Sequence, residues 1–176
     1  MTINPTEFHR YAFSNFLDNV VRGSLGEYIV ALALGITDDV PLNSWETYDI
    51  SYGNLKIEVK TSGYVQTWPQ KQRSTPRFGI QKREGYIGNT GNLDGIKARQ
   101  ANLYVFCLFT FQDFNDKEAA QKAILNTEYW NFYVVPTIKL PENQETIGLW
   151  LLEKITERVS FKSLNESIKK LDIAKT

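Results

Sequence analysis

The sequence predicts an α/β fold in which a central mixed β-sheet is flanked by helices. Three patterns support this: helical spacing of apolar residues near both ends of the chain, alternation of apolar and polar residues at 48–60, and an almost wholly apolar run at 103–109. Helices interspersed with apolar strands are typical of layered α/β domains. The chain has 176 residues, 42% of them hydrophobic, and no repeat or credible linker, so a single domain over residues 1–176 is expected.

Local start and stop signals set the expected elements. A long helix is expected from about 15 to 34, with Gly35 as its left-handed C-terminal residue. The elements expected after it are a hairpin at 48–60, a short strand at 77–80, a short helix at 94–101, a buried strand at 103–109, a helix at 116–125 capped by Asn115, a strand at 130–135 ended by Pro136, and a final helix from Ser163. Ser24-x-x-Glu27 and Ser163-x-x-Glu166 both match the capping box that marks a helix N-terminus.

The hairpin at 48–60 carries the strongest functional signal. Alternation assigns Tyr48, Ile50, Tyr52, Leu55, Ile57 and Val59 to one face, and Asp49, Ser51, Lys56, Glu58 and Lys60 to the other. A two-residue turn at Gly53-Asn54 would set Asp49 directly opposite Glu58. Carboxylates at that separation repel by about 3 kcal/mol at an effective dielectric of about 20. A divalent cation between them would turn this cost into a binding site.

Two interpretations of these residues stay open from the pattern alone. Lys56 and Lys60 lie diagonal to Asp49 across the predicted turn, so the polar face also fits an ordinary solvated surface of mixed charge. Glu27 likewise fits both a capping residue for Ser24 and a residue of the site, and the two roles do not exclude each other.

The pattern Asp49-x8-Glu58-x-Lys60 resembles the motif of the PD-(D/E)XK nuclease superfamily, whose members have the restriction-endonuclease-like fold. The resemblance covers residues from about Asn19 to Ile80. It includes the preceding helix, where Glu27 stands at the position of a glutamate that faces the metal site in many members, and a polar segment with Gln66 after the lysine. Tyr48 stands where the motif name has proline.

This resemblance implies Mg²⁺-dependent phosphodiester hydrolysis, with DNA cleavage by an endonuclease of restriction or repair type as the expected activity. Asp49 and Glu58, helped by the Val59 carbonyl, would hold Mg²⁺ or, as a substitute, Mn²⁺. Lys60 would orient or deprotonate the attacking water, and Glu27 would act through metal-bound water or as a further ligand. Paired cuts in a duplex would favour a homodimer.

Composition excludes several other classes of site. The chain has one histidine, His9, and one cysteine, Cys107, which excludes two-histidine zinc sites, four-cysteine clusters and disulfide frameworks. Cys107 lies within the apolar run and is expected to be a packed, inert thiol, and His9 is expected to be at the surface or half-buried. No run of 18 apolar residues and no secretory signal pattern is present, so a cytoplasmic protein without a membrane partner is expected.

The charge distribution favours a nucleic-acid partner although the net charge is zero. Residues 1–55 carry 2 basic and 7 acidic side chains, whereas residues 56–99 carry 9 basic and 3 acidic ones. Basic residues beside an acidic metal site would neutralise backbone phosphates. The expected nucleic-acid contacts are Gln66, Lys71, Arg73, Arg77, Lys82 and Arg83. A solvated loop face is the alternative explanation for this positive segment.

Two other functional classes fit the sequence. One is a non-catalytic nucleic-acid-binding or assembly module that retains the nuclease fold, and the other is a structural component of a larger complex. Metal binding distinguishes them, because an enzyme of the expected type should take up Mn²⁺ at the hairpin and the other two need not.

Overall fold

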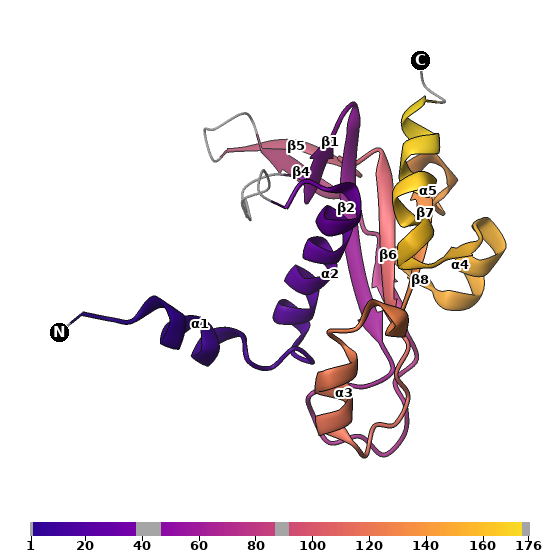
Figure 1. Ribbon diagram of the computed structural model, residues 1–176. Coiled ribbons are helices and arrows are strands. Elements are labelled where there is room, and N and C mark those ends of the chain that lie inside the picture. The colour runs from indigo at the N-terminus through magenta and orange to yellow at the C-terminus, as the bar shows by residue number, and fades with distance from the viewer. Residues whose placement is uncertain (1, 38–46, 87–91, 174–176) are drawn as a thin grey trace.

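The computed structural model describes residues 2–37, 47–86 and 92–173 (Figure 1). Its centre is a five-stranded mixed sheet with strand order β1-β2-β6-β7-β9, in which only β2 and β6 are parallel. The strands of this sheet are β1 (Ile50–Tyr52), β2 (Leu55–Gly63), β6 (Leu103–Phe109), β7 (Trp130–Pro136) and β9 (Arg158–Val159). The predicted α/β class with a mixed sheet flanked by helices is therefore confirmed.

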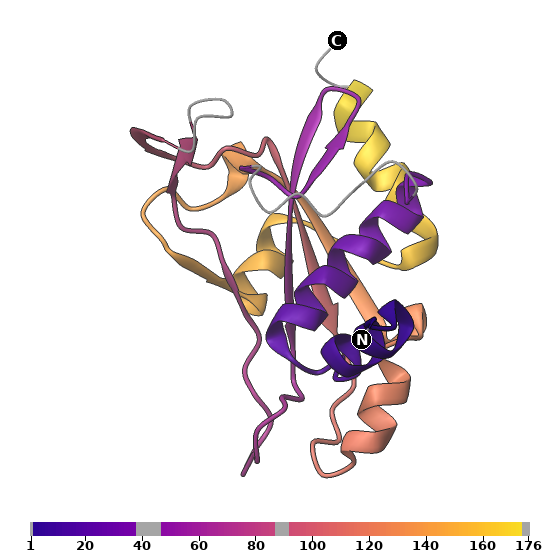
Figure 2. The ribbon, with the colours of Figure 1, turned by 90° about the vertical axis from the view of Figure 1, so that its left-hand side faces the viewer.

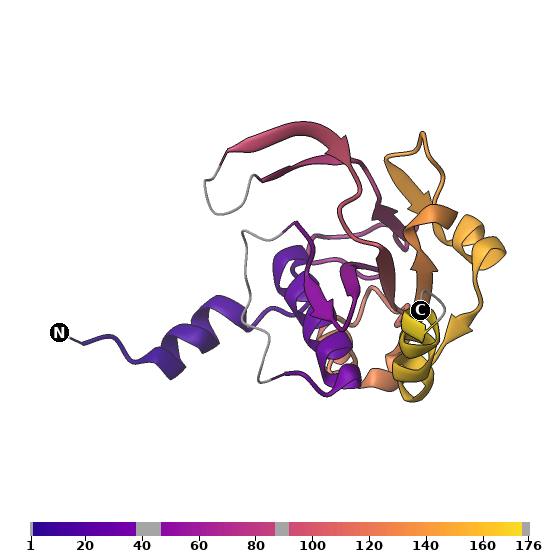
Figure 3. The same cartoon turned by 90° about the horizontal axis from the view of Figure 1, so that it is seen from above.

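The remaining elements are helices and two short ribbons. The helices are α1 (Pro5–Phe13), α2 (Asn19–Leu34), α3 (Lys117–Ala123), α4 (Leu149–Ile155) and α5 (Phe161–Ile173), with 3₁₀ turns at Thr127–Tyr129 and Thr137–Lys139. The ribbons are antiparallel pairs of β3 (Arg77–Gly79) with β8 (Thr146–Gly148) and of β4 (Arg83–Tyr86) with β5 (Leu93–Ala98). In Figures 2 and 3, α2 and α5 lie on one face of the sheet, and α4 and the two ribbons lie on the other.

Each face of the sheet has its own hydrophobic cluster. Leu55, Ile57 and Val59 of β2 pack with residues of α2 and α5 on the first face. On the second face, Tyr104 and Phe106 of β6 pack with residues of β3, β8 and α4. All seven residues of β6 are buried because this central strand has both faces covered. The prediction of a buried strand at 103–109 is confirmed.

Helix α2 lies unusually close to β2. A Cβ built on Gly26 would lie 2.1 Å from the Thr61 Cγ2 atom, so only a residue without a side chain fits between helix and strand. The Asp18 carboxylate caps the N-terminus of α2 by accepting hydrogen bonds from the Val20 and Val21 N–H groups. Gly35 ends the helix with φ 73°, as predicted. The expected capping box at Ser24 is wrong, because Ser24 lies inside the helix.

Several other sequence predictions can now be judged. The strands at 77–80 and 130–135 are confirmed as β3 and β7. The helix expected at 94–101 is wrong: this segment contains most of β5, and Gly95 has φ 72°, which a helix does not allow. Ser163 does not begin the last helix, which starts at Phe161, although Leu164 and Ile168 are buried as their spacing predicts. Asp116 rather than Asn115 caps α3.

Both residues that limit the possible site chemistry lie as expected. Cys107 is fully buried, and burial raises the pKa of its thiol. His9 is exposed on α1. Among the described helices, none has the length and apolar character needed to cross a membrane.

Candidate functional site

The hairpin of β1 and β2 has the predicted register. Ile50 pairs with Ile57, Ser51 with Lys56, and Tyr52 with Leu55, around a turn in which Gly53 has φ 55°. Ile57 is fully buried, whereas Glu58 is only half-buried, so the alternation along β2 also agrees with the prediction.

The predicted assignment of faces is wrong at Tyr48, because the chain forms a bulge at Asp49 and Ile50. The Asp49 N–H donates to the Ile57 carbonyl at 3.0 Å, although Ile57 is already the partner of Ile50. Two consecutive residues thus oppose one, which shifts the phase of the strand. As a result, Tyr48 packs with the second hydrophobic cluster, and its ring lies 5.3 Å from the Lys56 ammonium. Asp49 directly follows Tyr48 at this bulge and leaves the regular alternation of the strand.

Asp49 instead occupies the edge of β2. Strand β1 pairs with residues 55–57 only, so this edge has no strand partner over residues 58–63 in the described sheet. The Val59 N–H points to the edge and donates to Asp49 Oδ2 at 2.6 Å. Carbonyls of alternate residues in a strand face the same side, so the Val59 carbonyl faces the same edge as the Ile57 carbonyl, which is bonded to Asp49.

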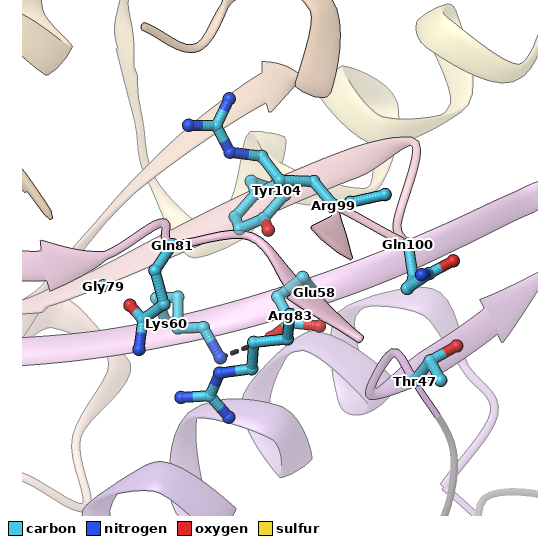
Figure 4. Close-up of a pocket in the computed structure, with 10 residues that line it drawn as sticks. Thr47, Glu58, Lys60, Gly79, Gln81, Arg83, Arg99, Gln100 and Tyr104 are labelled. Carbon is cyan, nitrogen blue, oxygen red and sulfur yellow. Dashed lines mark ion pairs between the residues drawn. The ribbon is translucent and has the colours of Figure 1, made fainter. Parts of the chain in front are cut away.

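Glu58 and Lys60 extend from β2 into a pocket on the second face of the sheet (Figure 4). The Lys60 ammonium lies 2.5 Å from Glu58 Oε1, and the two side chains are 29% and 18% exposed. The pocket has a volume of about 150 Å³. Its ion pair is thus partly shielded from water but remains open to a small ligand.

Glu27 of α2 is electrostatically coupled to this group from the first face of the sheet. Burial and the charges of Asp49 and, more weakly, Glu58 together raise the pKa of Glu27 to about 7, against the opposing effect of Lys60. Burial and the charge of Glu58 raise the pKa of Asp49 to about 6, although the Val59 N–H and Lys60 oppose this. Three carboxylates from separate segments therefore share one lysine around the unpaired edge of β2.

Several pocket residues carry no signal in the sequence. Besides Glu58 and Lys60, the pocket is lined by Thr47, Gly79, Gln81, Arg83, Ala98, Arg99, Gln100 and Tyr104. Tyr104 is the register partner of Glu58 in β6, and burial and the Glu58 charge raise the pKa of its hydroxyl to about 12. Its position in an apolar run predicted only a core residue. No described residue forms a hydrogen bond with this hydroxyl, which leaves it available to a ligand.

Most of the basic residues predicted to contact nucleic acid lie outside the pocket. Among the five predicted basic residues, Arg83 alone lines it. Lys82 pairs with Glu142, Arg77 donates to Thr146 Oγ1 at 3.2 Å, and Arg73 donates to Gln112. Lys71 is exposed in the loop between β2 and β3. The positive charge of residues 56–99 is therefore distributed over several surfaces.

Gln66 is a structural residue rather than a surface donor. It is 6% exposed, its Oε1 accepts from Arg22 Nη2 at 3.1 Å, and its Nε2 donates to the Gly63 carbonyl at 2.9 Å. These bonds fix the loop that follows β2 onto α2. A phosphate contact by the Gln66 side chain does not fit this enclosure.

The possible metal ligands are few. Within the described ranges, no three Asp, Glu, His or Cys side chains are grouped closely enough to hold one ion. Asp49 and Glu58, whose charges interact, and the backbone carbonyl of Val59 offer hard oxygen donors near the edge of β2. Such a set fits Mg²⁺, which is usually bound by one or two carboxylates and keeps water or phosphate oxygens as its other ligands.

Comparisons with family models, with curated proteins and with solved structures gave no match to this chain. The inference about function therefore depends on the residues and geometry described above.

Proposed function

We propose that this chain is a Mg²⁺-dependent phosphodiesterase of the restriction-endonuclease-like class that cleaves DNA. The observation that carries the proposal is the convergence of Glu27, Asp49 and Glu58 with Lys60 at the unpaired edge of β2, where the pKa values of Glu27 and Asp49 are raised. Mutual repulsion of partly buried carboxylates costs stability, which indicates a function for the cluster other than folding.

Asp49, Glu58 and the Val59 carbonyl would hold the metal ion in this proposal. When bound, Mg²⁺ supplies charge stabilisation to a phosphoryl oxygen and lowers the pKa of water. Burial and, after it, the neighbouring negative charges raise the pKa values of Asp49 and Glu27. These raised values support cation binding, because a positive charge would stabilise both ionised carboxylates.

The chain's own side chains would perform the remaining steps. Lys60 balances the negative charge that develops on the phosphate and orients the attacking water. Glu27, with a pKa of about 7, exchanges a proton near neutral pH and suits a general base. Arg83 and the Tyr104 hydroxyl, both in the pocket, donate hydrogen bonds to phosphate oxygens.

Two measurements on the purified chain test the proposal. Calorimetric titration with Mn²⁺ should give one site that is lost in Asp49→Asn and Glu58→Gln, whereas Glu118→Gln, on the exposed face of α3, should bind as the wild type does. Incubation with supercoiled, linear duplex and single-stranded DNA should give Mg²⁺-dependent cleavage. Absence of both metal uptake and cleavage would contradict the proposal.

A non-catalytic nucleic-acid-binding module is the second candidate. The observation that favours it is the Glu58–Lys60 ion pair, which already neutralises one of the two expected metal ligands. This candidate predicts DNA binding that weakens with salt and that is unaffected by Mg²⁺, together with no cleavage of any DNA form.

A further inference from the structure

Helix α1 projects from the molecule as an arm that has no buried residue (Figure 3). We use the name "arm" for residues 3–13. Its large apolar side chains are exposed: Ile3 (78%), Phe8 (53%), Tyr11 (87%) and Phe13 (47%). An exposed apolar surface of this kind on a separate helix indicates an interaction site.

The sequence of the arm is amphipathic. Thr6, Glu7 and Arg10 follow helical spacing on one side, and Phe8, Tyr11 and Ala12 follow it on the other. A helix of nine residues is only marginally stable in water by itself. The free energy needed to form its first turn exceeds the free energy gained by the few residues added afterwards. The apolar side of the arm therefore needs a partner surface if the helix is to persist.

The base of the arm is fixed to the body of the protein. Leu17 is 2% exposed, and the Phe16 N–H donates to Gln121 Oε1 at 2.9 Å. Gln121 Nε2 in turn donates to Asn15 Oδ1 at 2.7 Å. The arm thus leaves the body at a defined point beside α2 and α3.

A complementary apolar surface lies on the outer side of α2. Val20, Tyr28 and Leu32 are separated by multiples of four residues and are 75%, 54% and 44% exposed. We call these three residues the α2 stripe. They follow one ridge of the helix. Figures 1 and 2 show α1 projecting from the side of the molecule on which α2 lies.

We propose that the arm and the α2 stripe form a reciprocal interface between two copies of this chain, with each arm packed on the stripe of the other copy. In an isologous dimer, each copy contributes the same surfaces to the interface. Both arms and both α2 stripes would therefore be covered in one dimer. Phe13 lies on the polar side of α1, so the interface would use Ile3, Phe8 and Tyr11 of the arm with the three residues of the stripe. If all six side chains were fully covered, they would bury on the order of 900 Å² per chain, comparable to the ~800 Å² per partner of a stable interface. None of these six residues is charged, so no desolvation of ions opposes the contact.

Sedimentation velocity across a wide concentration range tests this interface. The wild type should sediment with twice the chain mass of 20.2 kDa. Tyr11→Lys in the arm and Tyr28→Glu in the stripe should each raise the dimer Kd by about 30-fold or more, because every substitution occurs twice in the dimer. Ile138→Glu is the matched control, since Ile138 is 92% exposed and outside both surfaces, and it should leave the Kd unchanged.

Mixing the two variants provides the decisive measurement. A mixed dimer contains one wild-type contact between an arm and a stripe, and its other contact joins a lysine to a glutamate. The mixture should therefore dimerise more tightly than either variant alone. Melting temperatures equal to that of the wild type would exclude misfolding as the cause of dissociation. A monomeric wild type at all concentrations, or a mixture no tighter than its components, would overturn the proposal.

Discussion

The two halves of strand β2 differ in what surrounds them. Residues 55–57 pair with β1 on one side, and β6 begins to pair on the other at Ile57, whereas residues 58–63 pair with β6 alone. The first half contains two fully or almost fully buried apolar residues, Leu55 and Ile57. The second half contains Glu58 and Lys60, and its free edge faces Asp49.

This difference separates stability from chemistry within one strand. An unpaired edge leaves backbone groups free, and proteins commonly protect such an edge with charged side chains. Here the charges are mostly of one sign, and burial together with these charges raises the pKa of Glu27 and Asp49. The paired half should therefore determine folding, and the unpaired half should determine ligand binding and turnover.

Replacing a lysine in each half should give the largest contrast. Lys60→Met keeps a similar aliphatic stem and removes the ammonium beside Glu58, so it should lower the cleavage rate by about 10²–10³ while metal binding persists. Lys56→Met is the matched control in the paired half. It should lose only the contact with the Tyr48 ring, about 0.5–1 kcal/mol of stability, and cleave at the wild-type rate. Single-turnover kinetics measure both. Equal rates for Lys60→Met and the wild type would remove Lys60 from the mechanism.

Truncation of the core side chain in the paired half should mainly affect folding. Ile57 is fully buried on the first face of the sheet, so Ile57→Ala should lower the free energy of unfolding by about 3 kcal/mol through lost packing and a cavity. Urea denaturation gives this value. The cleavage rate of the folded fraction should stay close to that of the wild type. A loss of cleavage without a loss of stability would contradict the assignment of folding to the paired half and of turnover to the unpaired half.

The carboxyl groups around the unpaired half of β2 should make the stability of the protein depend on pH. Glu27 has a pKa of about 7 in the folded chain and 4.5 as a reference value. Protonated Glu27 thus contributes stability below about pH 4.5, and this contribution is lost as the pH rises to about 7. Without metal at pH 8, the free energy of unfolding of Glu27→Gln should exceed that of the wild type by about 1–2 kcal/mol. This difference should vanish near pH 4.5.

Glu166→Gln, on the exposed face of α5, serves as the control and should show no such pH-dependent difference. Addition of Mg²⁺ should reduce the difference for Glu27→Gln, because a cation stabilises the ionised carboxylate. A constant difference between Glu27→Gln and the wild type from pH 4.5 to pH 8 would show that burial and the neighbouring charges do not raise the pKa of Glu27.

Removal of a pocket hydroxyl should have the smallest effect. Tyr104→Phe deletes one donor facing the pocket and should raise KM for DNA by less than about tenfold, with kcat nearly unchanged. Tyr133→Phe is its counterpart in the same hydrophobic cluster, where the hydroxyl donates to Glu153 at 3.3 Å. It should alter stability slightly and leave KM as it is. A KM change in both variants would indicate a general packing effect.

Patterns over short distances predicted much of the fold. The turn at Gly53-Asn54 fixed the register of the hairpin, and Gly35 and Pro136 marked the ends of a helix and a strand. The capping boxes failed because Ser24 and Ser163 lie in helices that begin earlier. The segment at 94–101 failed because Asp94 Oδ1 accepts from the Gly85 and Ile96 N–H groups, which supports a bulged ribbon and not a helix.

The candidate site was predictable only where its residues are neighbours in the hairpin. Glu58 and Lys60 follow from alternation along one strand, but the bulge at Asp49 depends on a single additional backbone hydrogen bond. Tyr104 and Arg99 reach the pocket through tertiary structure. The Arg99 guanidinium donates to the Ile80 and Pro141 carbonyls and so supports the pocket wall. Residue spacing within one segment cannot predict such contacts between distant segments.

The buried thiol of Cys107 gives this protein an internal reporter. It is the sole cysteine among 176 residues, it lies on the face of the sheet covered by α2, and the charges of Glu27 and Asp49 contribute to its raised pKa. A disulfide reagent reaches it only when this helix separates from the sheet, so the modification rate measures the free energy of that opening. A ligand that contacts both α2 and the sheet would slow the modification of Cys107. The modification rate would then report how much of the protein has bound the ligand, without any label or substrate.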